Sequence, residues 1–256
     1  MQSDIVYEDP QSFSTRTEAI KAAADNGYRM IRDAQRGWLR FASTTAPGDI
    51  FIAHSLSGAW LLSVEHIGVA REFGPSITDG PGACTLSIPT LSGLYQAINR
   101  TYRLSVSLPQ IPLTNFEQQT STLPRTTETE RLAIVRVGQE IFRKALMEYW
   151  NGTCPLTGIT DPVLLRASHI VPWAECESDA LRLNVYNGLL LSSLWDAAFD
   201  AGLVSFTSDG VTLASPILSE SAALALGLAT HPVLHGLTPQ HEALLKRHRA
   251  KHGVGW

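Results

Sequence analysis

The sequence is poor in charge and carries no strong bias of either sign. Charged residues make up 17% of its 256 residues, below the roughly 25% of an average globular chain. Hydrophobic residues reach 44%, and a chain with that apolar content and little charge is not predominantly disordered. The formal net charge of −4 excludes a broadly basic coat for nucleic acid. Any contact with nucleic acid must therefore come from local basic patches.

Cysteines and long apolar runs are also scarce. The three cysteines contain no C-x-x-C pair, which argues against a disulfide framework and a four-cysteine zinc site. No apolar stretch reaches the roughly 18 residues that a membrane span needs. The first ten residues are polar and acidic, unlike a signal peptide. We therefore expect a cytoplasmic protein with no membrane partner.

The chain divides near its middle. Residues 108–127 are rich in Pro, Thr and Gln without a regular hydrophobic period, which predicts a linker, or alternatively a long ordered loop packed on one domain. Residues 1–107 open with a helical pattern over 15–36, whose first part Asn26-Gly27 could end. The strand-like runs that follow lie at 38–41, 49–54, 60–67, 69–73 and 103–106. We interpret residues 1–107 as a small α+β domain with a curved sheet.

Residues 128–256 predict a second domain. Thr127 and Glu130 make a capping-box pattern that opens a helix, and Asn151-Gly152 ends it. The elements expected after it are short strands at 155–158 and 164–170, a hairpin at 203–213, and helices at 219–228 and 239–251.

The residues with the densest chemistry lie between these elements. One segment reads Ser168-His169-Ile170-Val171-Pro172-Trp173, and a second runs from Asn187-Gly188 to Asp196 and Asp200. Four residues apart on an expected helix, the two aspartates share one face, where they repel unless a cation or a proton lies between them. Mg²⁺ prefers such oxygen ligands. An imidazole that deprotonates water, beside a metal ion, suffices for phosphodiester hydrolysis.

These motifs resemble the HNH endonuclease family, whose core is a ββα-metal fold. The pattern is Ser-His-Ile-x-Pro-Trp, then Asn-Gly-Leu-x-Leu, then Asp-x-x-x-Phe-Asp. Gln139, Phe142-Arg143, the run from Cys154 to Gly158, and His248-Arg249 also fit it. The resemblance covers roughly residues 130–250, about half of the chain. The fold class that it implies is α+β, with a small N-terminal sheet domain followed by a ββα-metal nuclease domain with flanking helices.

The resemblance also implies roles for individual residues. His169 matches the general base, and Asn187 matches the asparagine that braces the loop holding the base. Asp196 stands nine residues after Asn187, where the family usually has a metal-ligating histidine. A carboxylate serves Mg²⁺ or Mn²⁺ at least as well as an imidazole.

Two further residues are candidates for the metal site. Asp200 is expected to complete or polarise it; the alternatives are a solvated acid or an ion-pair partner of Arg166 or Arg182. Ser168 stands where many relatives have a metal-binding Asp or His, and its neutral hydroxyl is a weaker ligand.

A structural zinc, common in the family, is not expected. The matching positions are Cys154 with Thr157 and Ser192 with Trp195, and only one is cysteine. We expect apolar packing of Leu194 and Trp195 in its place.

Basic residues near these motifs are candidates for binding DNA: Arg143, Arg166, Lys246, Arg247 and Arg249. The basic run at 246–252 would grip phosphates or form a solvated face. Trp173 is expected to pack rather than to stack on a base.

The sequence thus predicts a metal-dependent HNH endonuclease that hydrolyses DNA, using Mg²⁺ or Mn²⁺. Because one site cuts one strand, a homodimer is expected. By analogy with modification-dependent restriction enzymes of antiviral defence, residues 1–107 would read a DNA feature such as a modified base. Trp38 and Trp60 could stack on a flipped base, although a place in the core of the sheet is favoured for both.

Other functions remain open. The nuclease could be a defence effector, silent until a small molecule or protein binds residues 1–107, or a catalytically weak DNA-binding module. His54-Ser55 gives only a weak hydrolase pattern, since the sequence has no G-x-S-x-G elbow.

Overall fold

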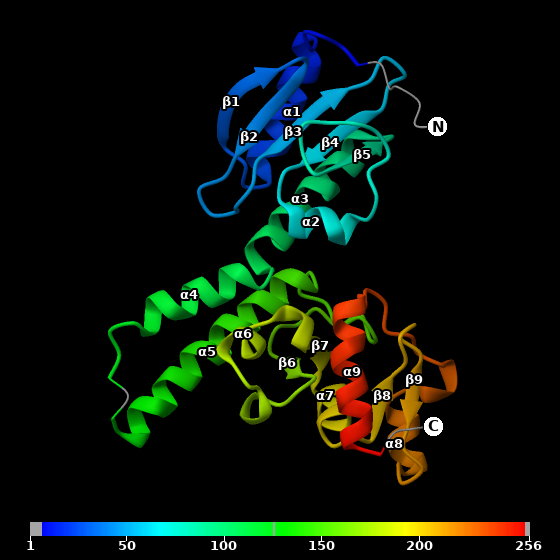
Figure 1. The fold of residues 1–256 in the computed structure, drawn as a ribbon. Coiled ribbons are helices and arrows are strands. Elements are labelled where there is room, and N and C mark those ends of the chain that lie inside the picture. Colours follow the sequence, from blue (N-terminus) through cyan, green and yellow to red (C-terminus); the bar gives the residue numbers. More distant parts are fainter. Residues whose placement is uncertain (1–6, 125, 254–256) are drawn as a thin grey trace. The chain divides into compact units, whose positions relative to one another are not determined.

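The structure, a computed structural model, describes residues 7–124 and 126–253. The chain forms two compact units, Met1–Leu108 and Pro109–Trp256, and each is described by itself (Figure 1). Within the described ranges, no helix combines the length and the apolar character needed to cross a membrane. Most of the acidic N-terminal segment that argued against a signal peptide lies outside the described residues.

The first unit is an antiparallel sheet with helices packed against it. The five strands lie in sequence order: β1 (Met30–Gln35), β2 (Trp38–Ala42), β3 (Ile50–His54), β4 (Trp60–Val64) and β5 (Cys84–Ile88). The helices are α1 (Phe13–Asp25), α2 (Ile67–Phe73) and α3 (Leu91–Ser107). Helices α1 and α3 contact each other and the central strands (Figure 1). The α+β class agrees with the sequence prediction, which left the strand topology open.

Both faces of the central strands are buried. Ile50 and Ile52 alternate along β3 with Phe51 and Ala53, and all four are nearly inaccessible. Phe51 and Ala53 belong to a second apolar cluster with Trp38 and Leu61. Because apolar side chains pack on each face of the sheet, the hydrophobic core of this unit lies on both sides of it.

Three of the elements expected in the first unit differ from the structure, and strand β5 was not expected. The helical pattern over 15–36 is helical only to Asp25: Gly27, with φ of 89°, turns the chain at the Asn26-Gly27 break, and residues 30–35 form β1 instead of a second helical part. Residues 69–73 form a helix instead of a strand, since the His66 side chain accepts a hydrogen bond from Val69 N and caps α2. Residues 103–106 lie in α3, not in a strand.

The second unit begins with two long helices and is built around a β-hairpin. The elements are α4 (Gln110–Thr120), α5 (Glu128–Tyr149), β6 (Leu165–His169), η1 (Trp173–Glu175), α6 (Asp179–Arg182), η2 (Val185–Asn187), β7 (Gly188–Ser192) and α7 (Ser193–Asp200). They are followed by β8 (Val204–Phe206), β9 (Thr212–Ala214), α8 (Glu220–Ala225), η3 (Leu228–Thr230) and α9 (Pro239–Lys251). The antiparallel pair β6–β7 followed by α7 is the ββα arrangement expected from the motifs.

Residues 110–120 are helical, which the composition of segment 108–127 did not predict. Pro112 lies in the first turn of α4, where its missing N–H costs no hydrogen bond. Pro112 and Phe116 are buried, and α4 packs against α5. The apolar face of α4 is short, which is why no hydrophobic period was visible.

The start of α5 confirms the capping box. Thr127 Oγ1 accepts a hydrogen bond from Glu130 N at 3.3 Å, and Glu130 Oε2 accepts one from Thr127 N at 2.9 Å. The strand expected at 155–158 is a turn instead. The hairpin expected at 203–213 is present as β8 and β9.

A glycine lets α5 approach the hairpin closely. At Gly188 an added Cβ would lie 2.5 Å from Phe142 Cζ and 2.7 Å from Leu146 Cδ1. Both contacts are shorter than side chains tolerate, so the Asn187-Gly188 pair serves packing as well as turning.

Candidate active site

The two faces of the β6–β7 hairpin carry different chemistry. His169 is paired with Gly188 at the end of β6, and Ser168 is paired with Leu189. Successive side chains of a strand point to opposite faces. Ser168 faces α7, where it contacts Asp200. His169 faces α5, where its ring stacks on Phe142. Ser168 and His169, neighbours on β6, thus contact two different helices, α7 and α5.

Ser168, Asp196 and Asp200 form a cluster of oxygen atoms, here called the oxygen cluster. The two aspartates lie one turn apart on α7. The buried Ser168 hydroxyl donates to Asp200 Oδ1 at 3.4 Å and also interacts with Asp196. Burial raises the pKa of Asp196, against the lowering effects of Ser168 and Arg166. Burial, and then the charge of Asp196, raises the pKa of Asp200.

The oxygen cluster lacks a directly paired cation. Among the described residues, neither Asp196 nor Asp200 makes an ion pair. Arg182 pairs with Asp179 instead, and Arg166 acts on Asp196 only through its charge. The site therefore holds two carboxylates whose charges are incompletely balanced by the protein.

The donor atoms fit a hard divalent cation. No group of three or more His, Cys, Asp and Glu side chains is placed to hold a metal in the described part of the chain. Mg²⁺, however, is commonly held by one or two carboxylates together with waters and substrate phosphates. Two carboxylates and a hydroxyl meet that requirement, whereas a closed zinc site needs four protein ligands.

The His169 ring is fixed on three sides. It stacks on Phe142 with ring centroids 3.8 Å apart, and it meets the edge of Trp173 at 5.6 Å. Its Nε2 lies 2.9 Å from Arg182 O. A carbonyl can only accept, so Nε2 carries the proton and Nδ1 of the neutral ring is free to accept. Burial lowers the pKa of His169, which outweighs the raising effect of Arg182 O.

The Nδ1 atom of His169 is not fully buried. No described residue hydrogen-bonds to it, and it is not one of the buried side-chain atoms that lack a partner in the described residues. No contact between the imidazole and Asp196 or Asp200 is present among the described residues. The structure thus brings Ser168 together with both aspartates, while His169, the next residue, lies on the opposite face of β6.

Asn187 braces the loop of residues 170–187, called the connecting loop. Its side chain is fully buried. Oδ1 accepts from Val171 N at 2.8 Å, while Nδ2 donates to Val171 O at 3.1 Å and to Leu181 O at 3.3 Å. One amide therefore joins both ends of the connecting loop. This is the bracing geometry that the family resemblance implies for this position.

Arg182 is a site residue that the sequence reasoning missed in this role. Its guanidinium donates to Cys176 O at 2.7 Å and to Trp173 O at 3.2 Å, and its carbonyl accepts from His169. Backbone contacts of this kind leave no sequence pattern, so only the structure could reveal them.

Trp173 is a packing residue of the connecting loop. An added Cβ at Gly138 of α5 would lie 2.4 Å from Trp173 Cη2 and 3.2 Å from Phe116 Cε2. The indole thus fills a space that the absent side chain of Gly138 leaves open. This agrees with the expectation of packing.

Three of the four positions matching the zinc ligands of relatives border one cavity of about 340 Å³. Thr157, Ser192 and Trp195 line it, together with Leu194. Trp195 is buried and stacks near Phe206, with centroids 6.2 Å apart, while Leu194 is about half exposed. The apolar packing expected here involves Trp195 more than Leu194.

Three of the arginines predicted to bind DNA already bind backbone carbonyls. Arg143 donates to Leu165 O and Pro162 O, and Arg166 donates to Val163 O. Arg249 donates to Phe206 O and pairs with Glu242. These contacts hold the hairpin and α9 in place.

The other two candidates lie on the exposed surface of α9. Lys246 is exposed and makes no ion pair with any described residue. Arg247 pairs with Glu177 of the connecting loop at 3.1 Å. Helix α9 is itself fixed near the oxygen cluster, because the His248 ring stacks on Phe199 at 3.9 Å.

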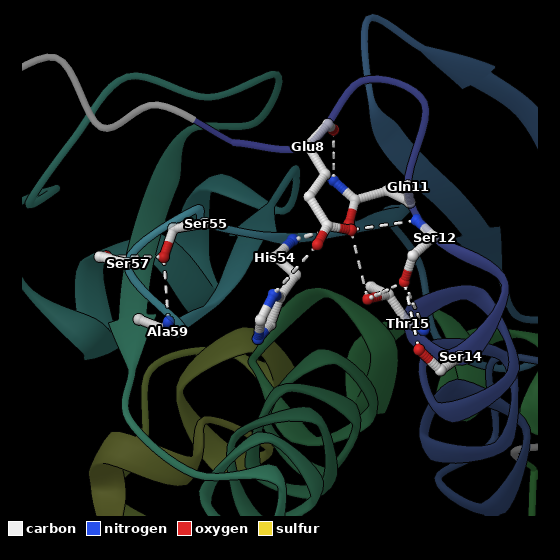
Figure 2. Close-up of polar contacts among 9 residues, drawn as sticks. All are labelled: Glu8, Gln11, Ser12, Ser14, Thr15, His54, Ser55, Ser57 and Ala59. Carbon is white, nitrogen blue, oxygen red and sulfur yellow. Dashed lines mark hydrogen bonds and ion pairs between the residues drawn. The ribbon is translucent and has the colours of Figure 1, made fainter.

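The first unit shows a polar network around Glu8 and His54 (Figure 2). The Glu8 carboxylate accepts from Ser12 N at 3.0 Å, at the start of α1, and lies 3.9 Å from His54 Nδ1. Ser55 Oγ accepts from Ala59 N and contacts Ser57. These contacts cap a helix and close a turn, and no described contact joins Ser55 Oγ to His54. The hydrolase pattern gains no support.

Trp38 and Trp60 are core residues, with 3% and 8% of their surface exposed. Trp38 nevertheless forms part of the wall of an open cavity of about 830 Å³. The rest of that wall includes Tyr7, Gln35, Arg36, Thr78 and Asp79. This is a candidate ligand pocket of the first unit.

Comparison with known proteins supports the family resemblance. A family model described as HNH endonuclease matches residues 154–207, the segment that holds the β6–β7 hairpin and α7. No curated protein matches the chain. Residues 154–207, which include strand β6 and the oxygen cluster, are therefore similar to the HNH endonuclease family.

Proposed function

We propose that the protein is a metal-dependent endonuclease that hydrolyses phosphodiester bonds of DNA. The observation that carries this proposal is the oxygen cluster on α7, which adjoins a strand ending in a neutral histidine. An HNH domain supports nuclease activity in general. The roles of individual residues, the metal dependence and the biological role are proposals.

His169 acts as the general base. Because Nε2–H donates to Arg182 O, Nδ1 is the atom that takes a proton from the attacking water. The lowered pKa keeps the ring neutral near pH 7. Arg182 O then stabilises the imidazolium, and Asn187 fixes the connecting loop that carries this carbonyl.

Asp196 and Asp200 hold the divalent cation, with Ser168 orienting their carboxylates. When bound, Mg²⁺ or Mn²⁺ supplies electrostatic stabilisation of the charge that develops on the phosphate and on the leaving oxygen. The substrate phosphate would cross the end of β6, the place where the two faces of the hairpin meet. There it can reach both His169 and the oxygen cluster.

The first unit supplies recognition, and the biological role is restriction or another form of defence against foreign DNA. The cavity beside Tyr7 offers amide, hydroxyl and charged groups from Gln35, Arg36, Thr78 and Asp79, which suits a modified base. Cleavage of both strands would use a homodimer, with one site for each strand.

Plasmid cleavage tests the proposal. The wild-type protein is incubated with unmodified, methylated and hydroxymethylated plasmid in Mg²⁺, Mn²⁺ or EDTA. We expect metal-dependent cleavage and a preference among the three substrates. Absence of cleavage on every substrate and with every metal would contradict the nuclease proposal.

Two alternative functions give different outcomes. A gated effector would cleave only after a small molecule or a protein changes its oligomeric state. A DNA-binding module would bind DNA equally well before and after the His169→Ala substitution and would cut under no condition.

A further inference from the structure

Two ion pairs join α9 to the connecting loop. Lys251 Nζ lies 2.5 Å from Glu175 Oε1, and an Arg247 guanidinium nitrogen lies 3.1 Å from Glu177 Oε1. Lys251 and Arg247 are four residues apart on the helix, so they share one face. Glu175 and Glu177 belong to the loop that begins just after His169. Two cations of α9 therefore meet two acids next to the candidate base.

Lys251 also lies beside the oxygen cluster. Its charge lowers the pKa of Asp200, against the larger raising effects of burial and of Asp196. Packing fixes this position, since His248 of α9 donates through Nε2 to Phe199 O at 3.0 Å, and Phe199 precedes Asp200. An added Cβ at Gly202 would collide with His252, so the end of α9 is held against the end of α7.

We propose that Lys251 is a phosphate-binding residue of the nuclease site, and that DNA displaces Glu175 from it. The inference rests on the proposed function, because it assigns a substrate contact to the same site. In the free protein Glu175 occupies the place of a phosphate oxygen. When DNA binds, a backbone phosphate replaces Glu175 as the ion-pair partner of Lys251, next to the carboxylates that hold the cation.

The strength of the Glu175–Lys251 pair suits such an exchange. The Lys251 side chain is 42% exposed and that of Glu175 is 50% exposed. Exposed ion pairs of this kind contribute little to stability. A phosphodiester backbone releases condensed counterions when lysine neutralises it, so DNA competes well against one solvated carboxylate.

Arg249, one of the arginines predicted to bind DNA, could not make this exchange as easily. Arg249, with a side chain only 16% exposed, holds Phe206 O and Glu242. Removing it from these partners would leave a buried carbonyl without a donor. Releasing Lys251 leaves no buried group unpaired among the contacts described, because its one hydrogen bond is to the exposed Glu175.

DNA binding in EDTA, where cleavage is prevented, tests the inference. The anisotropy of a short labelled duplex is measured over a range of salt concentrations for the wild type, Lys251→Met, Glu175→Gln and the double variant. Lys251→Met should reduce the slope of log affinity against log salt by about 0.9, the value for one phosphate contact. Glu175→Gln should raise affinity about two- to fivefold, the factor that an exposed ion pair is worth.

The double variant separates exchange from simple repulsion. If Glu175 acts by holding Lys251, Glu175→Gln has no effect once Lys251 is Met, and the double variant behaves as Lys251→Met. Lys21 and Asp25 in the first unit form a matched exposed pair at 2.6 Å. Lys21→Met and Asp25→Asn should leave the affinity and the salt slope unchanged.

Three outcomes would overturn the inference. An unchanged salt slope in Lys251→Met shows that Lys251 does not bind phosphate. A Glu175→Gln gain that persists without Lys251 shows general repulsion by the acid. Failure of the wild type to bind DNA at all contradicts the proposed function and this inference together, whereas the first two outcomes leave the proposed function standing. Thermal melting of each variant confirms that it is folded.

Discussion

At His169 one backbone carbonyl determines which ring nitrogen can accept a proton. Arg182 O, 2.9 Å from Nε2, holds the proton on that nitrogen and leaves Nδ1 for water. Phe142 covers one face of the ring, and the resulting burial lowers the pKa of His169 below its usual 6.5. The neutral imidazole thus keeps its proton on Nε2 and leaves Nδ1 as the acceptor, as the proposed role of a base requires.

The pH dependence of cleavage follows from this lowered pKa. A base is active when neutral, so activity should persist as the pH falls through 6.5 and be lost only below it. Phe142→Leu, which covers the ring less, should raise the pH below which activity is lost (the acidic limb of the pH profile) toward 6.5. The measurement is kcat/KM against pH. A wild-type limb above 6.5, or a limb that Phe142→Leu leaves in place, would contradict the assigned role of His169.

The oxygen cluster predicts a stability effect of divalent cations. A cation that binds only the folded protein raises Tm in proportion to the logarithm of its concentration above Kd. Mg²⁺ or Mn²⁺ should therefore raise the wild-type Tm by about 2–4 °C for each kcal/mol that cation binding adds to the free energy of unfolding. Asp196→Asn and Asp200→Asn should lose this shift, while Asp161→Asn, at an exposed acid, should keep it. An equal shift in all four proteins would show that the cation binds elsewhere.

At the scale of elements, the sequence predicted the parts that local signals determine. The capping box at Thr127 and the turn in the hairpin at 203–213 use only neighbouring residues, and both are present. The ββα unit was expected from the family resemblance that the spaced motifs carry, and β6, β7 and α7 form it. The roles of the individual site residues stay predictions.

The elements that the sequence did not predict depend on tertiary contacts. Strand β1 is almost entirely exposed, so its sequence lacks the alternation of apolar and polar residues of a half-buried strand. Its residues were therefore predicted to continue the helix α1. Residues 103–106 carry β-branched and apolar side chains but complete the buried face of α3. The hydrogen bond from His169 to the Arg182 carbonyl and the packing of Trp173 over Gly138 have no sequence signature, since both depend on residues that only the fold brings together.

Packing between α5 and the connecting loop predicts the effect of Gly138→Ala. The new methyl group would lie 2.4 Å from Trp173 Cη2 and would push the indole away from its site. Overpacking of this kind costs about 1–3 kcal/mol, and because Trp173 contacts His169, cleavage should fall as well. Urea unfolding and plasmid cleavage measure the two effects. Gly58→Ala is a control with free space around it, although its φ of 91° adds some strain. Unchanged stability and cleavage in Gly138→Ala would refute this account of the loop.

At the scale of the whole molecule, the two units suggest a division of labour. All residues proposed for chemistry lie in Pro109–Trp256, while the candidate ligand pocket lies in Met1–Leu108. The motifs that identified the nuclease do not extend into the first unit. Its sheet and core could be predicted in outline, but nothing in its sequence indicates what it contacts.

Removal of the first unit tests this division. A protein comprising residues 109–256 should retain metal-dependent cleavage and lose any preference among unmodified, methylated and hydroxymethylated DNA. The ratio of cleavage rates on the three substrates, for the fragment and for the full chain, is the quantity to compare. A fragment that keeps the full preference would place recognition in the second unit.

The central claim is that His169 and the oxygen cluster form one hydrolytic site. Conversion of supercoiled plasmid to nicked and linear forms in Mg²⁺ or Mn²⁺ tests it most directly, with the wild type, His169→Ala, Asp196→Asn and His235→Ala compared. His235 is an exposed histidine of the same unit and serves as the matched control. The account predicts metal-dependent cleavage by the wild type and His235→Ala, with a loss of about 100-fold or more in His169→Ala and a comparable loss in Asp196→Asn. Undiminished cleavage by either of those two variants would contradict it.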